Sequence, residues 1–311
     1  MSSERYKKYT EQIKAEALRL GFSACGIAPA DDVGVNSVYL SEWLKKGNHG
    51  GISYMENHFD KRVDPRLLVE GTRSIISLAL NYFPSRKLDN NQYQFAWYAY
   101  GKDYHDIMRV KLDSLYNYIH ENIQPVNGRA FCDTAPVLER YWAWRAGLGW
   151  IGKNTQLIIP GAGSYFFLGE IFLDLELLYD EPKPNRCGDC SLCLQHCPTG
   201  ALEQPFELNC RKCLSYLTIE NRDEIPPLVR NHMGNRIYGC DQCQESCPWN
   251  RFASPTKEPG FEPSEAFITM NKDDWDKLTE EQYNEIFRGS AVKRAKYSGL
   301  MRNIRAVKDQ P

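Results

Sequence analysis

The segment CGDCSLCLQHCP, residues 187–198, determines the fold of the second half of this chain. Its four cysteines have the spacing C-x2-C-x2-C-x3-C and precede a proline, as in bacterial ferredoxins that bind two [4Fe–4S] clusters. In that arrangement the first three thiolates bind one cluster, and the fourth, Cys197, binds the other. The segment therefore predicts a partner motif elsewhere in the chain.

The partner motif lies between residues 240 and 248, where the cysteine spacing repeats with one cysteine fewer. The first cluster is expected on Cys187, Cys190, Cys193 and Cys247. The second is expected on Cys197, Cys240, Cys243 and one further ligand, which the spacing leaves open between Cys210 and Cys213. Structural zinc is the alternative use of C-x2-C pairs. A zinc site has four ligands, however, and the two motifs with their Cys-Pro endings supply more than that.

Composition limits the class of protein. The chain has 311 residues, a net charge of −2 and 11 cysteines. No apolar run approaches the roughly 18 to 20 residues of a membrane helix, and the N-terminal segment has no hydrophobic signal core. We therefore expect a cytoplasmic protein with reduced thiols and no membrane association. Cys25 and Cys132 lie outside the cluster motifs, and Cys25 is expected to act as a small buried hydrophobic residue.

The residues before the cluster motifs alternate between helix and strand patterns. Helices are predicted over residues 5–20, 37–46, 104–122 and 136–146, where apolar residues recur at helical spacing. Strands are predicted over residues 22–28, 73–82, 129–133, 155–159 and 164–175. The pattern indicates an α/β or α+β fold. The sequence contains no G-x-G-x-x-G fingerprint, no P-loop and no c-type haem motif.

Three domains are expected from these patterns: residues 1–180, residues 181–253 with the clusters, and residues 254–311 as a Pro-rich connector and basic helical tail. Residues 291–308 of the tail carry six basic side chains and no acidic one. Such a stretch is either a solvated helix face or a binding surface for an acidic partner.

Five further segments make nearly the whole chain resemble the epoxyqueuosine reductase family. They are KRVDPR (61–66), YGKDYH (100–105), DTAPVLER (133–140), AGLGWIGKN (146–154) and GNRIYGCDQCQ (234–244), in the family's order. The resemblance implies an α+β chain with an α/β cobalamin-binding reductase domain, a bacterial ferredoxin-like double [4Fe–4S] domain and a short helical tail. It also favours Cys213 over Cys210 as the remaining cluster ligand.

The function implied by the resemblance is the reduction of epoxyqueuosine to queuosine in the anticodon loop of tRNA, the last step of queuosine biosynthesis. The cofactors implied are two [4Fe–4S] clusters and base-off cobalamin, with the protein supplying orientation and a proton. The implied proton donor is Asp133, a role that requires burial to raise its pKa. The alternative is that Asp133 caps the following helix, and Thr134 can take that cap instead.

The resemblance also places other residues at the cofactor and the substrate. The expected cobalamin contacts are Arg62, Asp133, Asn154, Leu157, Leu168, Ser215, Asp241 and Gln242. Core packing alone would equally explain Leu157 and Leu168. His105 and Lys102 are expected to border the substrate cavity, although the start of a surface helix is an equally good account of both.

The partners implied are a tRNA with a queuosine-type anticodon and an external low-potential electron donor. Longer family members carry additional helical repeats after the cluster domain, and this chain resembles a short form without most of them. Phosphate contacts are then expected from Lys293, Arg294, Arg302 and Arg305. We expect a monomer.

Two other functions remain open from the sequence. A reductive dehalogenase-like cobalamin enzyme would act on a small organohalide, but such enzymes typically follow a twin-arginine signal, which we do not find here. A polyferredoxin-like electron carrier would need no deep cavity, so residues 1–180 would be oversized for it. A test for corrin binding distinguishes these functions, because both enzymes would bind corrin and the electron carrier would not.

Overall fold

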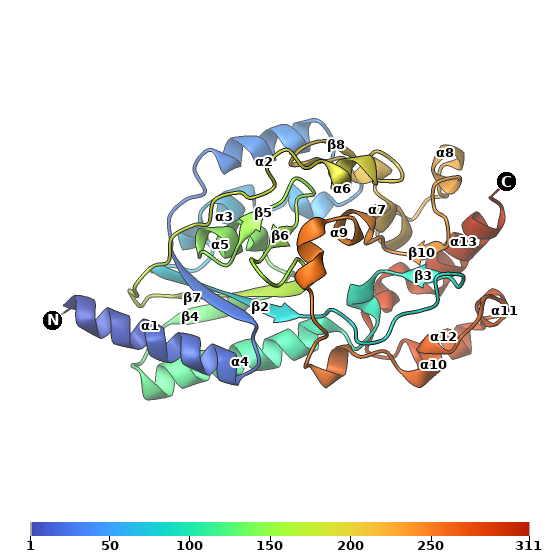
Figure 1. Cartoon of the computed structure of the whole chain (residues 1–311). Helices are drawn as coiled ribbons and strands as arrows, with labels where there is room; N and C mark the ends of the chain where they lie inside the picture. The colour runs from blue at the N-terminus through green and yellow to red at the C-terminus, as the bar shows by residue number, and fades with distance from the viewer. Residues whose placement is uncertain (1, 311) are drawn as a thin grey trace.

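A four-stranded antiparallel sheet forms the centre of the N-terminal half (Figure 1). This computed structural model describes residues 2–310. The strand order is β1 (Ala24–Pro29), β2 (Ser74–Asn81), β7 (Phe166–Leu173) and β4 (Gly128–Phe131). All three neighbouring pairs run antiparallel, so the α+β class is confirmed. Among residues 2–310, no helix has the length and apolarity needed to cross a membrane.

Helices cover both faces of this sheet. On one face α1 (Ser2–Arg19) and α4 (Tyr104–Asn122) contribute Ile13, Met108 and Leu112 to the core. On the other face α5 (Glu139–Arg145) contributes Trp142. Because β2 and β7 are covered on both sides, their sequences are nearly continuous apolar runs rather than alternating ones. Gly26 lets α5 approach β1, since a Cβ there would lie 2.0 Å from the Ala146 carbonyl oxygen.

The predicted elements are present, with differences at their ends. Helix α4 has the predicted bounds, and α2 (Asn36–Lys45) begins one residue early. Helix α5 begins at Glu139 rather than at Pro136, because the preceding residues form tight turns in which the Thr134 and Val137 N–H groups donate to carbonyl oxygens two residues back. The strand predicted over 155–159 is reduced to β6 (Leu157–Ile158), which pairs with an unpredicted β5 (Trp150–Ile151). Cys25 lies partly buried on β1 and packs against the core.

A separate hydrophobic core joins distant parts of the chain. Strand β3 (Gln94–Phe95) pairs in parallel with β10 (Arg236–Tyr238), and Phe95 packs against Trp275 of the C-terminal segment. This core includes residues of α7 (Leu214–Ile219), α10 (Glu265–Ile268), α11 (Lys272–Asp276), α12 (Glu280–Ile286) and α13 (Lys296–Lys308). The domain limits at residues 180 and 253 stay a prediction, but hydrophobic packing crosses both.

The cluster motifs lie on short elements between these cores. They are α6 (Leu192–Gln195), β8 (Leu202–Gln204), β9 (Glu207–Leu208), α8 (Pro227–Arg230) and α9 (Gln242–Glu245), and α3 (Phe59–Val63) lies earlier in the chain. Helix α6 begins two residues after Cys190, and α9 begins two residues after Cys240. The two helices contact each other. The two cysteine motifs therefore lie side by side.

Arg302 on α13 is buried, which contradicts its predicted role as a phosphate contact. Its guanidinium donates hydrogen bonds to the carbonyl oxygens of Asn221 and Asp223, both at 2.7 Å, and of Leu217 at 2.9 Å. Burial lowers the pKa of Arg302 from its ordinary value. The side chain therefore joins α13 to α7 and the loop that follows α7, instead of facing solvent.

Replacing Arg302 by lysine should lower the free energy of unfolding by about 2–3 kcal/mol, because an ammonium cannot bond all of these carbonyls and buried acceptors lose their partner. Urea denaturation followed by circular dichroism measures this change. The exposed Arg305 on the same helix provides the control, and Arg305→Lys should change stability by less than about 0.5 kcal/mol. Equal losses in the two variants would contradict a structural role for Arg302.

Candidate active site and cluster-binding cavities

The four cysteines expected to bind the first cluster line one cavity of about 220 Å³. They are Cys187, Cys190, Cys193 and Cys247. The Asn185 carboxamide oxygen accepts a hydrogen bond from the Cys187 N–H, and Lys153 donates to the carbonyl oxygens of Gly188 and Cys190. These contacts fix the first cysteine loop against the segment after β5.

The second group of cysteines lies in the wall of a different cavity of about 430 Å³, lined by Cys197, Cys210, Cys213, Cys240 and Cys243. Burial, and then the nearby thiols of Cys240, Cys213 and Cys197, raise the pKa of Cys243. Cys210 has a different neighbourhood: its N–H donates to the Asn48 carbonyl oxygen, and burial followed by the Cys213 thiol raises its pKa to about 12. Besides burial, the Cys213 thiol acts on the pKa of Cys243 and of Cys240, whereas Cys210 does not, so the choice of Cys213 as the ligand stays a prediction that these contacts support.

Most of the predicted cobalamin contacts line the same cavity as the second cysteine group. They are Asp133, Asn154, Leu168, Ser215, Asp241 and Gln242. Asn154 donates to the Cys243 carbonyl oxygen at 3.1 Å, which ties the cavity wall to a cluster motif. Leu157 does not line it and is buried in the core beside α5, so core packing accounts for this residue.

Arg62 lies in an adjoining cavity of about 540 Å³ instead. The side chain is buried, one terminal nitrogen donates to the Tyr54 carbonyl oxygen, and Nε has no partner among the described residues. The two cavities share Tyr98, Tyr104, Asp133, Ile219 and Glu220 in their lining. A molecule in either cavity can therefore reach Asp133.

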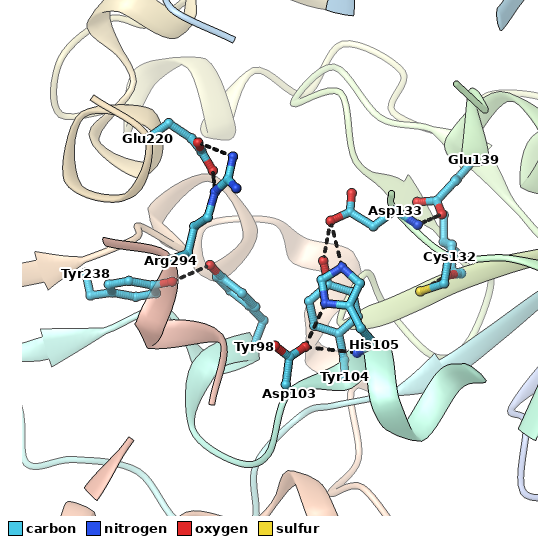
Figure 2. Close-up of polar contacts among 11 residues, drawn as sticks. Tyr98, Asp103, Tyr104, His105, Cys132, Asp133, Glu139, Glu220, Tyr238 and Arg294 are labelled. Atoms are coloured by element: carbon cyan, nitrogen blue, oxygen red, sulfur yellow. Dashed lines mark hydrogen bonds and ion pairs between the residues drawn. The ribbon is translucent and has the colours of Figure 1, made fainter. Parts of the chain in front are cut away.

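Asp133 is held by side chains from the start of α4 (Figure 2). The Tyr104 hydroxyl donates to Asp133 Oδ2 at 2.6 Å, and His105 Nε2 lies 3.2 Å from the same oxygen. The Asp133 backbone has the left-handed φ of 57°, and its N–H donates to the Glu139 carboxylate. Asp103 Oδ1 lies 2.7 Å from His105 Nδ1 on the other side of the imidazole ring.

In the protein chain alone, the pKa of Asp133 is lowered rather than raised, and the rise expected on burial against the corrin stays a prediction. The hydrogen bond with His105 and that from Tyr104 stabilise the carboxylate and hold its pKa below the ordinary value, although burial acts in the opposite direction. The side chain also remains 55% exposed. The capping alternative fails as well, because α5 begins after Leu138 without any side-chain cap from Asp133 or Thr134.

His105 lies between two carboxylates, which the sequence did not reveal. The hydrogen bonds with Asp103 and Asp133 raise its pKa to about 9. Asp103 has this position because it caps α4, accepting the His105 N–H at 3.0 Å. Lys102, by contrast, is exposed and lines neither cavity, which contradicts its expected place at a cavity wall. The polar run DYH at a helix start was the signal for this group.

Replacing His105 by glutamine should destabilise the protein by about 1 kcal/mol at pH 6, after allowance for solvent screening. The folded-state pKa of about 9 lies above the ordinary histidine value of 6.5, so this stabilisation is fully present below about pH 6.5 and is lost as the pH rises through 9. Urea denaturation at pH 6, 8 and 10 measures the gap to the wild type. If the difference in unfolding free energy between wild type and variant does not shrink with rising pH, His105 is not stabilised as an imidazolium.

Two neighbouring glutamates were also missed: Glu139, which is half-buried and accepts the Asp133 N–H, and Glu170, which lies near Glu139. Glu170 is fully buried in the middle of β7, with one oxygen 3.2 Å from the Ser77 hydroxyl and the other without a partner among the described residues. Burial raises the pKa of Glu139 to about 7, and burial with the neighbouring Glu139 raises that of Glu170. A glutamate within the apolar run FFLGEIFL was the available signal.

The predicted RNA contacts are divided between surface and cavity. Lys293 and Arg294 line the cavity that contains Arg62, and Arg294 forms a bidentate ion pair with Glu220 (Figure 2). Arg305 is exposed on α13. The structure thus brings Lys293 and Arg294 near Asp133 and leaves Arg302 in the core.

Comparison with known proteins connects both halves of the chain to one family. Residues 62–134 match the family model "Epoxyqueuosine reductase QueG, DUF1730", and residues 186–250 match the "4Fe-4S double cluster binding domain". The epoxyqueuosine reductase of Cellulophaga algicola is 46% identical over 97% of this chain and 99% of the relative. That of Leadbetterella byssophila is 47% identical, with the same coverage of both chains.

Solved structures agree with the sequence comparison. A crystal structure of epoxyqueuosine reductase with an epoxyqueuosine-modified tRNA-Tyr stem loop has a TM-score of 0.89 and 30% identity, covering 96% of this chain and 80% of that chain. Sequence and fold agree across nearly all of the described residues. The chain therefore belongs to the epoxyqueuosine reductase family.

Proposed function

We propose that this protein reduces epoxyqueuosine to queuosine in the anticodon loop of tRNA, using cobalamin supplied with electrons by two [4Fe–4S] clusters. The observation that carries the proposal is one cavity that contains Asp133 and the second cysteine group together. The relatives above are named for this activity, and the solved structure is of an epoxyqueuosine reductase with an epoxyqueuosine-modified tRNA stem loop. A cytoplasmic location, where tRNA is found, follows from the proposal.

The cysteine groups fit two iron–sulfur clusters. Four cysteines line the cavity of about 220 Å³, and four others, counting Cys213, lie together in the wall of the cavity with Asp133. Contacts between α6 and α9 bring the two motifs side by side. This proximity is needed because the last cysteine of each motif binds the cluster of the other motif. Each cluster would transfer one electron at a time towards the cavity.

The residues that line this cavity support a corrin beside the second cysteine group. Its wall includes the apolar side chains of Phe166 and Leu168 and the polar side chains of Asn154, Ser215 and Gln242. Apolar walls suit the faces of the macrocycle, and the polar groups suit its peripheral amides. When bound there, cobalamin would supply low-valent cobalt able to combine two single electrons for reductive removal of oxygen.

The chain's own residues would handle the protons. Opening the epoxide and losing its oxygen as water consumes two electrons and two protons, and Asp133 is placed to protonate the departing oxygen. Because Asp133 has a lowered pKa, it needs a proton supply, and the His105 imidazolium is 3.2 Å away. Tyr104 keeps the acceptor oxygen oriented towards the junction of the two cavities.

The adjoining cavity of about 540 Å³ would accept the modified nucleoside. Tyr54 and Tyr98 line it with aromatic surface on which a base can stack, and Lys293 and Arg294 supply positive charge for phosphates. Arg305, exposed on α13, would contact more distant phosphates.

Genetic complementation tests the function. A bacterial strain without its own epoxyqueuosine reductase accumulates epoxyqueuosine in tRNA, and expression of this chain should restore queuosine, measured by mass spectrometry of tRNA nucleosides. Epoxyqueuosine that persists despite soluble, cluster-containing protein would contradict the proposal. Growth with and without added cobalamin separates a missing cofactor from a wrong assignment.

A further inference from the structure

The cavity of the first cysteine group lies close to the surface, while the second group lines the cavity proposed for the corrin. Gly188, Asp189 and Leu192, which alternate with the ligands Cys187, Cys190 and Cys193 along the chain, are all exposed. A corrin would cover the second group from the other side. The first group is therefore the one that an external molecule can approach.

Charge around this first cavity has one sign. Its lining includes Lys153, Arg186 and Arg251 and no aspartate or glutamate. Lys153 is occupied by two carbonyl oxygens of the cysteine loop. Arg186 and Arg251 are exposed, and within residues 2–310 neither forms an ion pair. In a chain of net charge −2, the side chains around the four thiolates therefore form a local positive surface whose two arginines have no ion-pair partner among the described residues.

Apolar side chains accompany these two arginines. Leu192 is 36% exposed, and Phe252 is 41% exposed, with the Arg251 guanidinium over its ring at 4.5 Å. Leu192 and Arg251 also line a hollow of about 990 Å³ that reaches both Cys247 and Cys240, one ligand from each cysteine group. We call Arg186, Leu192, Arg251 and Phe252 the docking face.

We propose that a small acidic protein carrying a low-potential one-electron centre binds the docking face and reduces the first cluster. The inference rests on the proposed function, because a reductase that consumes two electrons per epoxide needs a donor. Each docking event oxidises the carrier by one electron and reduces the cluster by one electron, without proton transfer, so two events serve each epoxide. Electron-transfer contacts of this kind are small, with an apolar centre and charges that steer association.

The positive charge of the docking face favours an acidic partner over a second copy of this chain. Two copies of the docking face would oppose like charges, since Arg186 and Arg251 are uncompensated. Asp189 is the one acidic residue within the first cysteine loop, and Asp241 and Glu245 line the larger hollow but not the first cavity. Binding should therefore weaken steeply with salt.

The test compares two reductants on cluster-loaded protein, with cluster reduction followed by stopped-flow absorbance rather than by turnover. Reduced flavodoxin, an acidic one-electron flavin protein, should reduce the double variant Arg186→Glu/Arg251→Glu at least about tenfold more slowly than wild type at low salt. Dithionite, which needs no docking face, should reduce both proteins within about threefold of each other. Lys8→Glu/Arg129→Glu, a distant exposed pair, makes the same charge change and should match wild type.

Iron content measured before each run ensures that the variants carry both clusters. Equal flavodoxin rates in wild type and the docking-face variant would overturn the proposal, as would flavodoxin that fails to reduce a wild type that dithionite reduces. A docking-face variant that changes sedimentation of the chain alone, with unchanged flavodoxin rates, would assign the face to self-association instead. If dithionite-reduced, corrin-bound wild type converts no epoxyqueuosine, the proposed function fails independently of docking.

Discussion

Asp133→Asn should lower the rate of epoxyqueuosine reduction by about 10²–10⁴-fold, the usual contribution of a positioned acid. The amide cannot give a proton to the departing oxygen, yet it can still accept the Tyr104 hydrogen bond, so the loop should keep its conformation. Conversion of modified tRNA stem loop is measured anaerobically with dithionite, while the corrin spectrum reports cofactor binding.

The control for this variant is Asp113→Asn, an exposed aspartate on α4 that lines neither cavity. It should retain wild-type activity. Asp133→Asn that binds corrin and converts tRNA at the wild-type rate would remove Asp133 from the chemistry and leave it a structural role on the loop between β4 and α5.

Cys213→Ser should abolish turnover, because it removes a ligand from the cluster nearest the proposed corrin. Iron content should fall from about eight to about four atoms per chain as the second cluster is lost. Cys210→Ser should retain both clusters, since Cys210 bonds through its backbone to Asn48 and lies apart from the group around Cys243. Iron analysis and electron paramagnetic resonance of the reduced proteins measure both outcomes.

The pair Cys210 and Cys213 forms a matched comparison, because the two cysteines are three residues apart and line the same cavity. The opposite result, with clusters lost in Cys210→Ser and kept in Cys213→Ser, would reverse the ligand assignment. Loss of both clusters in both variants would indicate that the loop folds only with every thiol present.

The sequence predicted the double-cluster domain because cysteine spacing acts locally, while the ligands of each cluster stay a prediction. C-x2-C pairs on short loops bring their thiols together whatever surrounds them, and the Cys-Pro endings required an exchange of ligands between motifs. Helix α4 was predicted to the residue for a similar reason, since its apolar spacing is regular over 19 residues. Local pattern was sufficient for both.

The environment of Asp133 could not be predicted in the same way. Its pKa depends on Tyr104 and His105, which reach it only after α4 packs on the sheet, and no spacing rule encodes this contact. Arg302 failed for a related reason. It borders the apolar stripe that contains Leu300 and Ile304, and sequence analysis assigned it to the surface by its charge alone. Burial of a charged group is decided by partners distant in sequence.

Mass spectrometry of nucleosides from an epoxyqueuosine-modified tRNA stem loop, incubated anaerobically with cluster-loaded protein and dithionite, tests the central claim most directly. With cobalamin present, the account predicts loss of one oxygen from the modified nucleoside to give queuosine, and without cobalamin it predicts unchanged epoxyqueuosine. Unchanged epoxyqueuosine in both samples, with corrin demonstrably bound, or equal conversion in both, would contradict it.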